Sequence, residues 1–219
     1  MAGLVVVTGP AVEPVSVADV IQHLRLDADT NEDEVEAYIK AAREWVENYT
    51  GRAFINRTLR LSIDGIDEVD IPLWEGWKTG PDISLRKRDI LIPKPPLFSV
   101  TSVTTYDDDD NGTAFAASKY YVDKAREPGR VFLRNGEVWP TALRVSNAVE
   151  IVYVAGYGTT AGAVPASVVF AMKALAAWLY EHRGEEAPEK LPANIALLLQ
   201  PYRVMSLSTD PFYNGYRAA

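Results

Sequence analysis

Hydrophobic residues recur at helical spacing in the first part of the chain. Ser16 is a favourable N-cap residue with Asp19 three positions on, and the spacing predicts a short helix that begins just after it. Asn31 and Glu34 form a similar cap in front of a longer amphipathic helix, which Gly51 is placed to end. The predicted apolar face of this second helix consists of Val35, Tyr38, Ile39, Ala42, Trp45, Val46 and Tyr49.

Between Phe54 and Gly158 the pattern changes to short runs of β-forming residues that glycine and proline interrupt. Apolar and polar residues alternate in the first run, as in a sheet with one solvent-exposed face. The predicted strands are Thr58–Ile63, Val69–Leu73, Ile90–Ile92, Val100–Tyr106, Tyr120–Asp123, Val131–Leu133 and Val149–Val154. This part of the chain is therefore predicted to be an antiparallel β domain.

Helical spacing returns in the last part of the chain. Pro165 can open a third helix because the first helical position does not need an N–H donor, and Gly184 is placed to end that helix. A fourth, shorter helix follows Pro192. The sequence thus predicts an α+β fold in which N- and C-terminal helices form a bundle around an inserted antiparallel β domain. The predicted segments are the N-terminal helices (14–52), the β insertion (53–160), the C-terminal helices (161–203) and an extended tail (204–219).

Composition narrows the range of functions. The 219 residues are 47% hydrophobic and 24% charged, which is enough for a buried core. No apolar run is long enough for a membrane helix and the first residues lack a basic leader, so we expect a soluble chain made in a cytoplasm. The chain has no cysteine and only two histidines, His23 and His182, which we interpret as structural. Most classes of enzyme are disfavoured.

The charge is concentrated in one stretch. The formal net charge is −8, and between Glu13 and Glu47 ten acidic residues accompany three basic ones. A protein that grips DNA phosphates needs an excess of lysine and arginine, so the sequence argues against that function. The acidic stretch could be a solvated helix face, a surface that repels DNA, or a surface that meets a basic partner.

Three motifs suggest chemistry that their context does not support. Asp107–Gly112 matches the first half of a calcium-binding loop, but Ser118 stands where the bidentate glutamate is required, and Asn-Gly between strands predicts a hairpin turn. Gly156–Gly158 lacks the remainder of a phosphate-binding loop and is interpreted as a turn. Arg86–Arg88 could contact DNA phosphate, although solvated charges that protect an edge strand from pairing with another chain explain it better.

Six short motifs follow one another in order from about Pro14 to Arg203. They are Trp45–Arg52; Ile92–Val103 followed by Tyr106; Tyr120–Asp123 with Pro128–Val131 and Trp139–Pro140; Val149–Gly158; Val164–Pro165 with Trp178–Arg183; and Leu197–Arg203. In this order they resemble the motifs of the head-to-tail connector (adaptor) proteins of tailed phages, a family that includes adaptors of prophages and of gene transfer particles.

The resemblance implies a structural protein of the virion neck, assembled in the host bacterial cytoplasm, with no catalytic residues, cofactor or metal. It implies a homo-oligomeric ring, expected to be twelvefold, that docks beneath the portal protein and contacts a stopper or tail-completion protein. Double-stranded DNA would pass through the lumen without sequence-specific binding, and no membrane is involved. Two alternatives are another neck or tail-completion (stopper) protein and a metal-dependent hydrolase that uses the acidic residues.

Two sites are predicted as hypotheses. The segment after Met205 has no periodicity but contains three aromatic residues, so it is either a frayed terminus or a segment that orders on a partner. By resemblance such an extension reaches the portal, and the predicted portal-binding residues are Tyr202, Arg203, Asp210, Pro211, Phe212, Tyr213 and Tyr216. The predicted acidic face toward the DNA consists of Glu32, Asp33, Glu36 and Glu47, all expected to lie off the apolar stripe and to be exposed.

Overall fold

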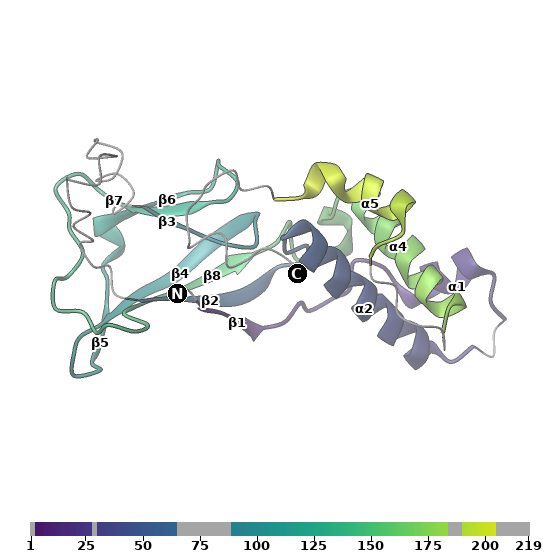
Figure 1. Ribbon diagram of the computed structural model, residues 1–219, viewed down its shortest axis with the longest axis horizontal. Coiled ribbons are helices and arrows are strands. Elements are labelled where there is room, and N and C mark those ends of the chain that lie inside the picture. Colours follow the sequence, from purple (N-terminus) through teal and green to yellow (C-terminus); the bar gives the residue numbers. More distant parts are fainter. Residues whose placement is uncertain (1–2, 28–29, 65–88, 184–189, 205–219) are drawn as a thin grey trace. The chain divides into compact units, whose positions relative to one another are not determined.

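The chain folds into a unit of strands and a unit of helices (Figure 1). The computed structural model describes residues 3–27, 30–64, 89–183 and 190–204. Within these, the β unit contains residues 3–9 and 57–155, and the helical unit contains residues 10–56 and 156–204. The prediction of an α+β fold, with antiparallel strands between N- and C-terminal helices, is confirmed.

The described residues of the helical unit form four α-helices. They are α1 (Val17–Leu24), α2 (Glu32–Thr50), α4 (Ala166–Glu181) and α5 (Ala193–Leu199), with short 3-10 turns at Ala161–Ala163 and Gln200–Tyr202. Both predicted N-caps are present, because the side chain of Ser16 accepts a hydrogen bond from the amide of Asp19, and that of Asn31 accepts one from the amide of Asp33. Gly51 ends α2 in the left-handed conformation, as predicted.

One predicted helix end is wrong. Helix α4 ends at Glu181, before Gly184. The aromatic ring of Trp178 stacks on the ring of His182 at a centroid distance of 4.2 Å, and the carbonyl of Trp178 accepts the amide of His182. These contacts give His182, the C-cap residue of α4, a structural role, and Gly184 itself lies outside the described residues.

The core of the helical unit joins residues that are far apart in the sequence. Helix α2 packs against α4, and α4 packs against both α1 and α5. Phe54 and Ile55, which follow α2, also lie in this core. Its fully buried members include Val35, Val46, Phe54, Ile55, Val168, Ala171, Leu175 and Leu199. The aromatic and aliphatic stripes of α2 and α4 are therefore core faces.

The described strands of the β unit form two antiparallel sheets. The first has the order β1-β2-β8-β4-β5, formed by Gly3–Thr8, Arg57–Ile63, Val149–Ala155, Leu97–Tyr106 and Gly112–Ala114. The second has the order β3-β7-β6, formed by Asp89–Leu91, Arg130–Leu133 and Tyr120–Asp123. The hydroxyl of buried Tyr153 on β8 donates to the carbonyl of Pro93, just after β3, across 2.9 Å. This bond links β8 of the first sheet to the segment that follows β3 of the second sheet.

Two strands were not predicted from the sequence. The first is β1, an unbroken apolar run whose side chains do not alternate between a buried and an exposed face. The second is β5, which has only three residues. Strand β4 also begins at Leu97, earlier than predicted, because irregularities in its pairing with β8 interrupt the alternation. The predicted strand Val69–Leu73 lies outside the described residues.

None of the helices in the described part of the chain is both long enough and apolar enough to cross a membrane.

Candidate docking sites

The last described residues pack against the C-terminal end of α2. The amide of Val204 donates to the carbonyl of Thr50 at 2.8 Å. The guanidinium of Arg203 lies over the ring of Tyr49, 4.9 Å from its centroid. A Cβ atom on Gly51 would lie 3.5 Å from the Cβ of Val204, so the two segments are in close contact. Residues 203 and 204 are therefore held against the C-terminal end of α2 by these contacts.

Arg52 connects this segment to two others. Its Nε donates to the carbonyl of Tyr202, and its Nη1 donates to the hydroxyl of Tyr157 at 3.2 Å. The hydroxyl of Tyr202 lies 2.8 Å from the Oγ of Ser167 at the start of α4. We call Tyr49, Gly51, Arg52, Tyr157, Ser167, Tyr202, Arg203 and Val204 the exit cluster. It holds together the end of α2, the turn after β8, the start of α4 and the turn after α5.

The turn Gly156–Gly158 belongs to the same region and has no geometry for a phosphate. The amide of Asn56 donates to the carbonyl of Gly158 at 2.9 Å, and the amide of Tyr157 donates to the carbonyl of Phe54 at 3.0 Å. Gly156 has a φ of 142°, and a Cβ there would lie 2.5 Å from the backbone nitrogen of Asn56. Glycine is needed here because two backbone segments approach closely, as the interpretation of a turn predicts.

Three of the motifs found in the sequence meet in the exit cluster. Trp45–Arg52, Val149–Gly158 and Leu197–Arg203 are far apart along the chain. Arg52, Tyr157 and Tyr202, one from each motif, are joined by hydrogen bonds. Sequence reasoning recognised the motifs but not this contact, since no spacing along the chain reports it.

Of the predicted portal-binding residues, two lie in the exit cluster. Tyr202 is half-buried and held by the contacts described above, whereas Arg203 is exposed. The other five predicted residues, Asp210, Pro211, Phe212, Tyr213 and Tyr216, lie outside the described residues. The portal site therefore stays a prediction, with the exit cluster as the place from which the tail starts.

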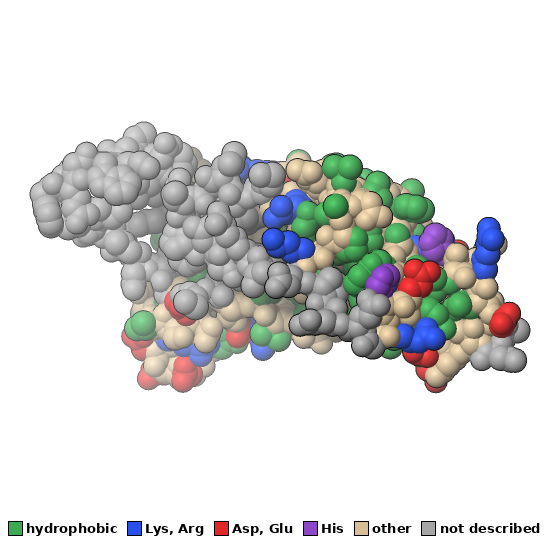
Figure 2. Space-filling view, turned by 45° about the vertical axis from the view of Figure 1, so that its right-hand side comes forward, with side chains coloured by type: hydrophobic (Ala, Val, Ile, Leu, Met, Phe, Trp, Pro, Cys, Tyr) green, Lys and Arg blue, Asp and Glu red, His purple; other side chains and the backbone are tan. Residues whose placement is uncertain are grey.

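The predicted acidic face is smaller than expected. Glu32 and Asp33 are exposed in the first turn of α2, where negative charge also favours the helix dipole. Glu36 forms an ion pair with Lys40 across 2.7 Å, one turn along the helix. On the face in Figure 2, the acidic side chains that are described are scattered among basic and apolar ones and form no continuous patch.

Glu47 does not belong to that face, and its expected exposure is wrong. The residue is 3% exposed, and its carboxylate accepts from Arg43 Nη1 at 3.0 Å and from the amide of Phe54 at 3.2 Å. Arg43 is also buried and donates to Glu13 at 2.8 Å. The chain folds back over the end of α2 after Gly51, which buries a helix position that the apolar stripe alone places in solvent.

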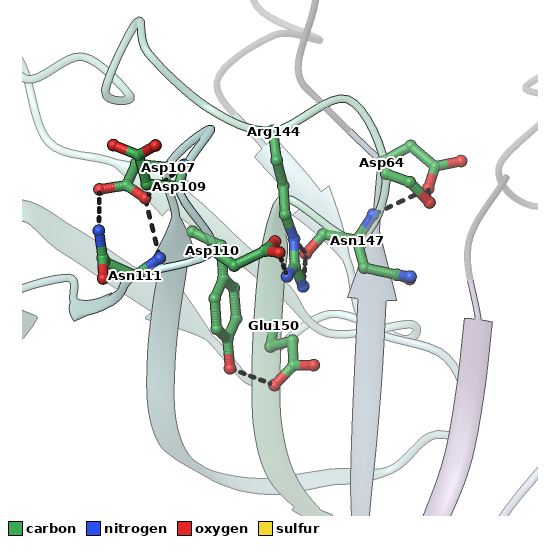
Figure 3. Close-up of polar contacts among 10 residues, drawn as sticks. Asp64, Asp107, Asp109, Asp110, Asn111, Arg144, Asn147 and Glu150 are labelled. Carbon is green, nitrogen blue, oxygen red and sulfur yellow. Dashed lines mark hydrogen bonds and ion pairs between the residues drawn. The ribbon is translucent and has the colours of Figure 1, made fainter.

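The β4–β5 hairpin confirms the interpretation of Asp107–Gly112 as a turn (Figure 3). The carboxylate of Asp107 accepts from the amides of Asp109 and Asn111 at 3.0 and 2.8 Å. These bonds, chiefly the one from Asn111, lower the pKa of Asp107. Both carboxylate oxygens of Asp107 accept hydrogen bonds within the turn, and the described residues contain no cluster of possible metal ligands.

Arg144 fixes this hairpin to the rest of the β unit (Figure 3). Its guanidinium donates to Asp110 at 2.9 Å and to the carbonyl of Asn147 at 2.8 and 3.1 Å. It also lies over the ring of Tyr106, whose hydroxyl donates to Glu150. The acidic turn is therefore a structural element with a partly neutralised charge.

The comparisons with known families and with solved structures both point to head completion and neck proteins. A family model described as "Head completion protein" matches residues 13–205. A chain in the neck of an empty gene transfer agent (GTA) particle, computed with C6 symmetry, is 25% identical with a TM-score of 0.72, and the match covers 95% of this chain and 98% of that one. Chains in a native GTA virion and in a native GTA neck with C12 symmetry are each 24% identical, with TM-scores of 0.72 and 0.70. Those matches cover 94% and 95% of this chain and 98% of each of the others. No curated protein matches the sequence.

The burial of Glu47 generates a prediction about stability. In Glu47→Lys a second cation would lie beside Arg43 in a buried site, and the amide of Phe54 would lose its acceptor. Breaking a buried ion pair costs about 3 to 5 kcal/mol, so we expect a loss of that size or failure to fold. Glu32→Lys is the matched control, because it changes an exposed acid of the same helix and should stay within about 0.5 kcal/mol of the parent protein. Urea denaturation measures both, and equal stability of the two variants would contradict the structural role of Glu47.

Proposed function

The chain belongs to the head completion protein family, and we propose that it forms the adaptor ring of a particle neck, docked beneath the portal protein and joined to a stopper or tail-completion protein. Membership confirms the resemblance to the neck proteins of phage-like particles, and it identifies the chain as a structural protein and not an enzyme. The alternative of a metal-dependent hydrolase is thereby removed. The alternative of a stopper remains a second candidate, because a stopper is also a neck protein.

The observation that carries the proposal is the extent of the match. The family model covers both the helices and the strands, and the structural match at 25% identity extends over nearly the full length of both chains. Those neck structures were computed with C6 and C12 symmetry, which supports a ring of identical subunits. In such a ring each subunit presents two different surfaces to its two neighbours.

The tail is proposed to be the portal-binding element. The exit cluster holds residues 202–204 against the end of α2, so a segment that follows has a defined starting point. Residues 206–219 contain Phe212, Tyr213 and Tyr216 without the spacing of a helix or strand. Burial of an aromatic side chain contributes roughly 2 to 3 kcal/mol, so a portal groove could offset the cost of ordering a short segment.

The acidic face toward the DNA is proposed for Glu32, Asp33 and Glu36 only. These residues lie in the first turns of α2, and Glu32 and Asp33 are exposed. Negative charge in a lumen would repel phosphate and let DNA pass without adhering. The ion pair between Glu36 and Lys40 weakens this surface but does not cancel it.

Deletion of the gene tests the function as a whole. We expect DNA-filled heads and separate tails that do not join, because the neck ring that connects them is missing. Electron microscopy of purified particles provides the measurement, and expression of the intact gene from a plasmid should restore joined particles. Normal joined particles from the deletion strain, or a failure before head formation, would show that the protein acts elsewhere.

Removal of the tail tests the portal contact. A chain that stops after Met205 should keep its melting temperature, because the tail lies beyond the exit cluster, and should lose portal binding in a pull-down. Phe212→Ala with Tyr213→Ala in the full-length chain should reproduce the loss, while Ser206→Ala with Ser208→Ala should bind as the parent does. Full portal affinity without the tail would exclude it as the docking element. Binding to a tail protein in place of the portal would favour the stopper.

Reversal of charge tests whether the acidic residues of α2 line the DNA path. Glu32→Lys, Asp33→Lys and Glu36→Lys together should leave folding and assembly intact but slow DNA ejection, most strongly at low salt where screening is weakest. The control carries Asp108→Lys, Asp109→Lys and Glu127→Lys, three exposed acids of the β unit. If both sets of particles release DNA at the parental rate, α2 does not line the DNA path.

A further inference from the structure

Strand β1 is an edge strand with an apolar and largely exposed surface. It pairs with β2 on one side and ends the strand order on the other, so no described strand pairs with its outer edge (Figure 1). Three consecutive valines, Val5, Val6 and Val7, are 47%, 54% and 53% exposed. Such a run is unusual at the surface of a protein that stays monomeric, because it presents both free backbone groups and β-branched side chains.

The register of β1 shows that the hydrophobic layer of the β unit is left open at this edge. Val6 lies opposite Leu59 and therefore on the same face of the sheet. Leu59 is buried at 2% exposure, whereas its neighbour Val6 is more than half exposed. The layer that covers β2 thus does not extend over β1, and a further apolar element would complete it.

Strand β4 lies inside the sheet, but its first residues pair with no described strand on the side away from β8, and it carries features that β1 lacks. Strand β4 has irregularities between Leu97 and Ser99 and between Val100 and Ser102, and Lys124 Nζ donates to the carbonyl of Phe98 on that strand. Bulges and lysines are common devices against edge pairing. Strand β1 contains neither charge nor proline, and its single irregularity lies between Val6 and Thr8 near its end.

We propose that β1 of one copy of this chain pairs with the β5 edge of the next copy, so that the five-stranded sheets of neighbours join at the ring contact. A ring of identical subunits needs two different surfaces that fit each other, and β1 and β5 are the two ends of one sheet. Strand β5, Gly112–Ala114, is uncharged and exposed at all three positions, so its edge is open to such a partner. The inference deepens the proposed function, since it names the contact that closes the ring and rests on the ring being formed.

Cysteine pairs test this contact directly because the chain contains no cysteine of its own. Four double variants combine Val5→Cys or Val6→Cys with Thr113→Cys or Ala114→Cys, which samples neighbouring registers. Oxidation of assembled particles should give a ladder of disulfide-linked oligomers for at least one pair, and each single variant should give monomers. A disulfide dimer from Val5→Cys or Val6→Cys alone would show that β1 pairs with another β1 and would overturn the proposal.

Analysis of purified necks distinguishes a failure of the β1–β5 contact from a failure of the proposed function. If the double variants are incorporated into necks but none is linked, the ring exists and the β1–β5 contact is wrong. If the parent chain is absent from purified necks, the proposed function fails regardless of any disulfide.

A lysine at the edge gives an independent measurement. Val6→Lys should leave the melting temperature of the free protein unchanged, because the side chain is exposed, but should lower incorporation into particles by about tenfold or more, since edge lysines oppose strand addition. Val145→Lys is the matched control, at a residue 79% exposed and outside the strands of the β unit. Incorporation of Val6→Lys at the parental level would overturn the proposal.

Discussion

The turn that ends α2 is the constraint on which the helical unit depends. Glu47 is buried there with its charge satisfied by Arg43, and it also accepts the amide of Phe54 after the chain has reversed at Gly51. A buried carboxylate without these partners would be strongly unfavourable, so the reversal and the ion pair require each other. The same reversal brings Phe54 into the core and places Arg52 where it can donate to the carbonyl of Tyr202 in the turn after α5.

Arg52 extends this constraint to the segment that is proposed to meet the portal. Its planar group donates to two acceptors from different segments, an arrangement for which guanidinium is better suited than the lysine ammonium. Tyr202 is held as part of the scaffold, and the tail beyond it begins from an ordered base. Under this proposal the residues that bind the portal are not the residues that stabilise the fold. The aromatic side chains of the tail can then be substituted without loss of the core.

The β unit contains an apolar edge strand, β1, that the described residues of the same chain leave exposed. Strand β2 has buried residues such as Leu59, whereas its neighbour β1 has none, and Val6 on the same face as Leu59 is more than half exposed. An open apolar edge promotes aggregation of a free subunit, but in an assembly it can pair with a neighbouring subunit. At the opposite end of the sheet, Asp107 of the acidic turn is held by the turn backbone and Asp110 by Arg144, while the uncharged strand β5 that follows is exposed.

The sequence by itself determined the fold class, the helix caps at Ser16 and Asn31, the stop at Gly51, most of the strands and the family resemblance. All of these depend on residues close together in the chain or on motifs in a fixed order. Only the tertiary structure decided that Glu47 is buried, that three distant motifs meet at Arg52, and that β1 is a strand with an open edge. The physical reason is that burial and pairing depend on what another segment covers. Neither helical spacing nor strand alternation records a contact made by residues a hundred positions away.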